Sequence, residues 1–170
     1  MDATRASDPL PRHVVRLDGP NAREAIPVRL EPDAAGRAAV AAHLGIPALR
    51  KLRLEGRLAP EGRRDWRLDA ILGATVVQDC VVTLDPVTTR IDEPVVRRYL
   101  AALEPPPPGE SEMPEDDEAE PLPAALDLFA VMVEALALAL PPFPRAPGAE
   151  LGEARALPPE RYEGFIGILL

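Results

Sequence analysis

The chain has 170 residues, about the length of one ordinary domain, so we expect a single domain over residues 1–170. Hydrophobic residues make up 46% of the sequence, as in folded soluble proteins, whereas 22 prolines and 11 glycines indicate that part of the chain is not packed. Serine, histidine and cysteine are scarce, and a catalytic triad or a zinc site needs several of them. We therefore expect no enzymatic activity, no cofactor, no bound metal and no small-molecule substrate.

The acidic charge is concentrated in one segment. The formal net charge is −9, and residues 104–125 contain eight Asp and Glu and no Lys or Arg, while residues 1–103 contain 16 basic and 14 acidic residues. This segment is rich in proline and glutamate and has no periodicity, which predicts a flexible, disordered insert. It is either a solvated spacer or a tail that binds a basic protein. The candidate protein-binding residues are Glu115, Asp116, Asp117 and Glu118.

A short strand and an Ala-rich helix are predicted in the first 48 residues. Residues 13–17 (HVVRL) indicate the strand. The helix is predicted over about residues 32–44, where Pro32 suits the first helical position and Gly45 follows the end. His43, near the C-terminal end of the helix, is expected to have a capping or surface role. The face expected to pack on a sheet comprises Ala35, Ala38, Ala39, Val40, Ala42 and Leu44.

From Leu49 onward the hydrophobic period changes to two, which is typical of strands with one buried and one solvated face. A strand that starts at Leu49 and a strand over residues 65–72 form a predicted hairpin. Residues 74–84 predict a third strand, and residues 87–93 predict a fourth, which residues 95–100 extend. The hairpin side chains expected to be buried are Leu52, Leu54, Leu58, Trp66, Leu68, Ala70 and Leu72.

The most hydrophobic helix is predicted over about residues 127–140, with Asp127 as its N-cap. Its roughly 14 residues reach about 21 Å, which is short of the roughly 30 Å of a bilayer, so we expect no membrane partner. Because it is apolar on nearly every side, we expect other elements to bury it from more than one direction. The predicted fold class is α+β, an antiparallel sheet of about four to six strands packed against the Ala-rich helix (about 32–44) and the buried apolar helix (about 127–140), with a disordered acidic insert.

Basic residues gather on the predicted hairpin. Some alternate with the leucines and so share the solvated face of its first strand, and the others lie in and just after the turn. Such clusters bind phosphate groups through charge and counterion release. The alternative is an ordinary solvated strand face, because no aromatic stacking platform accompanies the cations. The candidate RNA-binding residues are Lys51, Arg53, Arg57, Arg63, Arg64 and Arg67.

Three segments in this order resemble one family: QDCVVTLDPV at residues 78–87, IDEP at residues 91–94 and DLFAVMVEALALALPPFPRAPG at residues 127–148. The sequence is similar, over roughly residues 10–150, to the YceD family of large ribosomal RNA subunit accumulation proteins. The resemblance implies one YceD-like domain, no assigned enzymatic activity and a role in the accumulation of large-subunit ribosomal RNA. Many members carry a second cysteine where this chain has Thr83, so no zinc role is carried over to Cys80, which we interpret as a small buried hydrophobe or a reactive thiol.

Two hypotheses of function follow. In the first, the protein is a noncatalytic factor in large ribosomal subunit biogenesis that supports accumulation or processing of large-subunit rRNA, by binding this RNA or its precursor. In the second, it is a protein-binding module whose acidic insert holds a basic ribosomal protein or an assembly factor. The N-terminus has no apolar run of signal-peptide length, and a lone cysteine fits a reducing compartment, so we expect a cytoplasmic protein.

Overall fold

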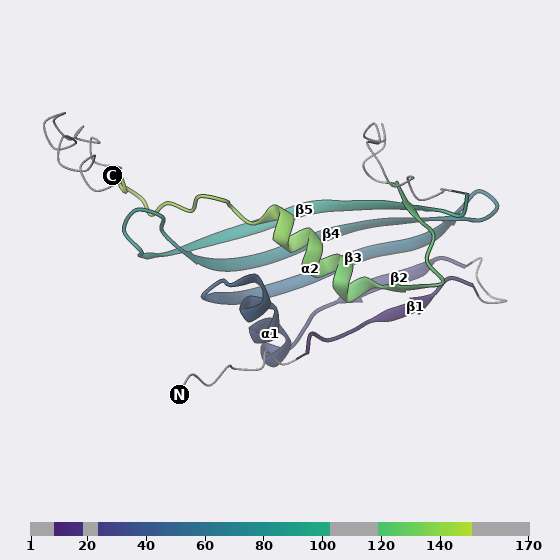
Figure 1. The fold of residues 1–170 in the computed structure, drawn as a ribbon, viewed down its shortest axis with the longest axis horizontal. Helices are drawn as coiled ribbons and strands as arrows, with labels where there is room; N and C mark the ends of the chain where they lie inside the picture. The colour runs from purple at the N-terminus through teal and green to yellow at the C-terminus, as the bar shows by residue number, and fades with distance from the viewer. Residues whose placement is uncertain (1–8, 19–23, 103–118, 151–170) are drawn as a thin grey trace, which may run out of the picture.

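The computed structural model describes residues 9–18, 24–102 and 119–150. In these ranges two helices accompany a mostly antiparallel five-strand sheet and a separate two-strand sheet (Figure 1), which confirms the predicted α+β class. The large sheet has the order β2-β3-β4-β5-β6, and the small sheet pairs β1 with β7. The elements are β1 (Val14–Arg16), β2 (Ile26–Leu30), α1 (Ala34–Leu44), β3 (Ala48–Glu61), β4 (Asp65–Asp79), β5 (Pro86–Leu100), β6 (Ala119–Pro121), β7 (Ala125–Asp127) and α2 (Leu128–Ala139).

The long strands β3, β4 and β5 form two consecutive antiparallel hairpins. The predicted alternation in the first hairpin is confirmed, because all seven side chains expected to be buried are at most 6% exposed. The expected separate third strand over residues 74–84 is wrong: β4 continues without interruption to Asp79, since its second half pairs with β3 on one side and β5 on the other. Pro94 is accommodated within β5 because β6 pairs only with Arg98–Leu100, so β5 is an edge strand at that point.

Helix α1 begins later than predicted. Asp33 is the N-cap, and its carboxylate accepts a hydrogen bond from the Gly36 N–H at 2.8 Å, while Gly45 adopts the left-handed C-cap conformation (φ 65°). The predicted packing face is confirmed for Val40, which is buried, and for Leu44, which packs against the core, but it is wrong for three alanines, because the other buried residues are Gly36 and Ala41. The alanines carry too little apolar surface to set the orientation, and the helix turns its larger Val40 side chain inward. The alanines that are exposed instead are Ala35, Ala38 and Ala42.

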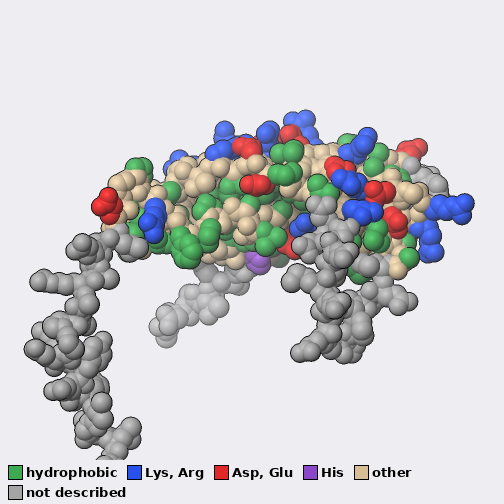
Figure 2. Space-filling view, turned by 90° about the horizontal axis from the view of Figure 1, so that it is seen from above, with side chains coloured by type: hydrophobic (Ala, Val, Ile, Leu, Met, Phe, Trp, Pro, Cys, Tyr) green, Lys and Arg blue, Asp and Glu red, His purple; other side chains and the backbone are tan. Residues whose placement is uncertain are grey.

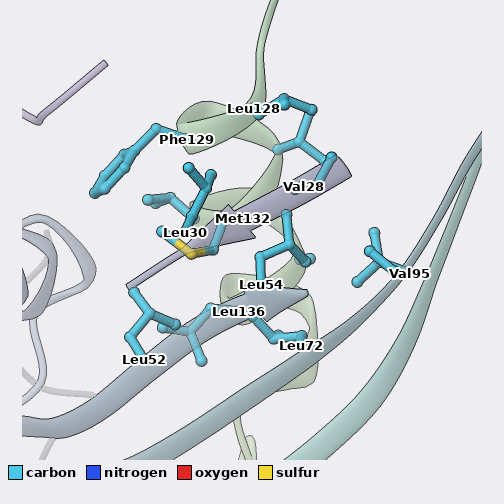
Figure 3. Close-up of a cluster of buried hydrophobic side chains, with 14 of the residues drawn as sticks. Val28, Leu30, Leu52, Leu54, Leu72, Val95, Leu128, Phe129, Met132 and Leu136 are labelled. Atoms are coloured by element: carbon cyan, nitrogen blue, oxygen red, sulfur yellow. The ribbon is translucent and has the colours of Figure 1, made fainter. Parts of the chain in front are cut away.

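Helix α2 crosses one face of the large sheet and supplies much of the core (Figure 1). Its predicted N-cap is confirmed, since the Asp127 carboxylate accepts hydrogen bonds from two backbone N–H groups of the first turn. Leu128, Met132 and Leu136 are at most 1% exposed and lie among side chains of β2, β3, β4 and β5 in Figure 3. Burial of each such side chain stabilises the fold by about 1.5–3 kcal/mol. Contacts with β4, β5 and β1 bury the helix from more than one direction, as expected.

No helix in the described ranges is both long enough and apolar enough to cross a membrane.

Two short strands lie where the acidic insert was expected to be unstructured. β6 falls inside residues 104–125 and β7 begins at Ala125, so the prediction is wrong for residues 119–125. The ordering comes from partners distant in sequence: β6 pairs with the end of β5, and Arg97 Nε lies 3.3 Å from Glu120 Oε1. Residues 103–118 lie outside the described residues. Strand β2, which the hydrophobic pattern did not predict, owes its place to antiparallel pairing with β3.

Candidate nucleic-acid interface

The face of the large sheet turned away from α2 is solvated and carries basic side chains. We call this surface the open face; it consists of the residues of β2 to β5 that alternate with the buried ones. In Figure 2, Lys and Arg side chains gather along the upper margin of the molecule, which is the open face seen edge-on. The basic residues of the open face are Arg29, Lys51, Arg53, Arg57, Arg67, Arg90 and Arg98.

The six predicted RNA-binding residues lie on the open face and at its hairpin turn, but they do not form one cluster. Lys51, Arg53 and Arg57 lie on β3 and Arg67 lies on β4, while Arg63 and Arg64 occupy the turn between these strands. From Lys51 to the end of β3 the chain advances by about 33 Å, at roughly 3.3 Å per residue. The hairpin therefore spreads the cations between an α1 end, near Lys51 and Arg53, and a turn end.

Intramolecular ion pairs neutralise part of this charge. Most of them join residues two apart on one strand, whose side chains share a face, and Arg29 stands directly opposite Glu55 on the neighbouring strand. Within the described ranges, Lys51, Arg57 and Arg64 have no carboxylate partner. The pairs are Arg29–Glu55 (3.6 Å), Arg53–Glu55 (3.3 Å), Arg67–Asp69 (2.9 Å), Arg90–Asp92 (2.6 Å) and Arg98–Glu61 (3.1 Å).

A cleft of about 330 Å³ opens at the α1 end of the open face. The register of β3 against β4 shifts between Leu49 and Lys51, so Arg50 is the extra residue of a β-bulge. Because of the bulge, the consecutive residues Arg50 and Lys51 both line the cleft. The charged residues in the lining are Arg37 from α1, Arg50, Lys51 and Arg53 from β3, Arg90 from β5, and Glu31.

Sequence reasoning missed three of these cations, Arg37, Arg50 and Arg90. A signal for Arg50 was present: the buried residues Leu49 and Leu52 are separated by an odd interval, which strict alternation does not produce. No local pattern indicates Arg37 or Arg90, because they come from other elements and meet the β3 cations only in the folded protein.

Cys80 is fully buried in the turn between β4 and β5. Its Sγ accepts hydrogen bonds from the backbone N–H groups of Val82 (3.5 Å), Thr83 (3.5 Å) and Ala146 (3.3 Å). Together with a hydrogen bond from the Thr83 side chain, the largest contribution, these donors lower the pKa of Cys80 to about 7. Thr83 thus supplies a hydroxyl donor to Cys80.

The candidate protein-binding residues Glu115, Asp116, Asp117 and Glu118 lie outside the described residues, so their role stays a prediction. In the part of the chain that the structure describes, no three His, Cys, Asp or Glu side chains are arranged to hold a metal ion.

A family model described as "Large ribosomal RNA subunit accumulation protein YceD" matches residues 68–163, just over half of the 170-residue chain. The match starts later than the resemblance, expected from about residue 10, and contains all three segments that carry it. The cleft residues of α1 and β3 and the six predicted RNA-binding residues precede residue 68, so the match assigns them no role. Comparisons with curated proteins and with solved structures found no match. The chain therefore belongs to the YceD family of large ribosomal RNA subunit accumulation proteins.

Proposed function

We propose that the protein supports accumulation of large-subunit ribosomal RNA by binding this RNA, or its precursor, through the open face, without catalysing a reaction. Family membership supplies the link to large-subunit rRNA. One observation supports the choice of the open face as the binding surface. Because α2 packs on the opposite side of the sheet, the basic side chains of four strands reach solvent there.

The open face suits contacts with phosphates better than contacts with bases. Base stacking needs exposed aromatic rings, whereas Trp66, Tyr99 and Phe129 are at most 5% exposed. Phe143 is 75% exposed, but it follows α2 and is not part of the open-face strands. Basic side chains bind backbone phosphates through charge, release counterions and make the affinity strongly dependent on salt. Because phosphate contacts carry no direct sequence information, we expect binding with little sequence preference.

The test removes two cations that have no carboxylate partner among the described residues. The variant Arg57→Ser/Arg64→Ser lowers the charge of the turn end by two. The control, Arg16→Ser/Arg145→Ser, makes the same change of net charge on β1 and after α2, away from the open face. Fluorescence anisotropy with a labelled fragment of large-subunit rRNA then gives Kd between 50 and 200 mM salt.

The expected result is a slope of log Kd against log salt that falls by about 1.4–1.8 in the turn-end variant, at roughly 0.7–0.9 per phosphate contact, and is unchanged in the control. A wild-type protein that binds no RNA even at 50 mM salt would refute the proposal. An equal fall in both variants would show that net charge, rather than the open face, determines binding.

A further inference from the structure

We propose that the cleft at the α1 end of the open face binds a phosphate monoester, the terminal phosphate of an RNA end. The inference rests on the proposed function and gives one part of the open face its own ligand. The rest of the open face would contact the phosphodiester backbone.

The charge balance of the cleft favours a dianion. Five basic residues line it, and the carboxylates around them are Glu31 in the lining, Glu55 on Arg53 and Asp92 on Arg90. Because Glu55 also pairs with Arg29, at least two positive charges are uncompensated. A backbone phosphodiester carries one negative charge, whereas a terminal phosphate carries about 1.5–2 at pH 7. A phosphate monoester thus matches the positive charge of the cleft better than a phosphodiester does.

Three of the five basic side chains in the cleft are held in place by the protein itself. Arg90 donates two hydrogen bonds to Asp92 (2.7 and 2.6 Å), and Arg53 Nη1 lies 3.3 Å from Glu55 Oε2. Arg37 Nη1 donates to the Pro32 carbonyl at 2.8 Å. Cations oriented in advance lose less conformational freedom when a ligand binds, which increases affinity.

Gly73 on β4 forms the floor between two of these arginines. A Cβ atom there would lie 2.8 Å from Arg53 Nε and 3.2 Å from Arg90 Nη2. The guanidinium groups of β3 and β5 therefore converge directly over the backbone of the strand between them. A methyl group at this position would push both arginine side chains aside.

A second cavity next to the cleft favours a nucleotide over a bare phosphate ion. Arg37 and Arg50 also line a cavity of about 450 Å³ between α1 and the start of β3, where most other lining residues are apolar. With its phosphate among the cations, a terminal nucleotide has this apolar recess beside it for its sugar or base.

The probes are three labelled RNA oligonucleotides of one sequence, with a 5′-phosphate, a 3′-phosphate or hydroxyls at both ends. Wild-type protein is expected to bind one phosphorylated form about tenfold more tightly than the hydroxyl form, as several charge-assisted hydrogen bonds would give. Arg50→Ser/Lys51→Ser should abolish this preference. The matched variant Arg57→Ser/Arg64→Ser should weaken all three complexes equally and keep the preference.

The outcomes separate this inference from the proposed function. Equal affinity of the wild-type protein for all three oligonucleotides would overturn the cleft assignment and leave RNA binding by the open face intact. If the wild-type protein binds none of the three oligonucleotides, both the cleft assignment and the proposed function are overturned. Adenosine monophosphate is the competitor: if it displaces the phosphorylated RNA at a concentration near the Kd of that RNA, the ligand is a free nucleotide and the RNA-end assignment is wrong.

Gly73→Ala tests the shape of the cleft without changing its charge. The added methyl group displaces Arg53 and Arg90, so the preference for the phosphorylated end should fall at least about threefold, while the salt dependence of hydroxyl-RNA binding stays unchanged. Full retention of the preference in a folded Gly73→Ala protein would contradict the proposed binding site.

Discussion

Replacing Asp127 by alanine is expected to destabilise the protein by about 2 kcal/mol, because this carboxylate joins the start of α2 to the N-terminal strand. Its Oδ1 accepts hydrogen bonds from the N–H groups of Phe129 (3.1 Å) and Ala130 (3.4 Å), and loss of such an N-cap costs about 1 kcal/mol. The same atom accepts from the His13 N–H at 3.0 Å, which contributes about 1 kcal/mol more. The Arg12 side chain, 3.1 Å from Oδ2, is 74% exposed and adds little.

Thermal unfolding followed by circular dichroism measures the effect. For a protein of this size, about 2 kcal/mol lowers Tm by about 4–8 °C. Asp127→Asn is the matched control, because asparagine keeps an acceptor oxygen and caps helices as well as aspartate does. We expect it to retain most of the stability. An Asp127→Ala protein that melts like the wild type at pH 7 would refute this reasoning.

The same carboxylate predicts a dependence on pH. Partial burial raises the pKa of Asp127, but the hydrogen bonds from His13, Arg12, Ala130 and Phe129 together outweigh burial and lower it. A lowered pKa means that the stabilisation is complete above the ordinary aspartate value of about 3.9 and is lost as the pH falls through the folded-state value. The stability difference between wild type and Asp127→Ala should therefore shrink in acid. A difference that grows below about pH 4 would contradict the assignment.

Three further substitutions test the core and the turn after β4. Leu136→Asp places a charge at a fully buried position and should remove much of a typical free energy of unfolding of about 5–15 kcal/mol. The control is Leu138→Asp on the same helix, which should leave the melting curve nearly unchanged because Leu138 is 75% exposed. Gly56→Ala should cost at least about 2 kcal/mol in denaturant unfolding, because the added Cβ would clash with the backbone carbonyl oxygen of Asp69 on β4; a loss no larger than in Gly73→Ala would contradict this. The wild-type protein should gain stability between pH 7 and about pH 9, and Cys80→Ser should abolish this gain. A thiol whose pKa is lowered to about 7 in the folded state stabilises the fold fully above its unfolded-state pKa, and this stabilisation is lost as the pH falls through 7. Equal pH profiles of stability for wild type and variant would show that the thiol does not contribute.

The local periodicity of hydrophobic residues in the sequence predicts much of this fold. Alternation from Leu49 predicted which side chains of the first hairpin are buried, because successive side chains of a strand point to opposite faces. The same period placed Lys51, Arg53 and Arg57 together on the solvated side. The apolar run after Asp127 and the capping aspartate predicted α2, since both signals lie within one helix and need no distant partner.

Pairing between strands determined the elements that these local patterns did not predict. β2 and β6 are strands because β3 and β5 offer them partners, and β4 runs unbroken to Asp79 because it pairs on both sides. The length of the hairpin separated cations that are close in sequence, while a bulge and two other elements brought Arg50, Arg37 and Arg90 to one cleft. A one-dimensional pattern reports which way each side chain faces along its own strand or helix. Which residues of different elements meet depends on register and packing between segments far apart in the chain, and only the tertiary structure sets those.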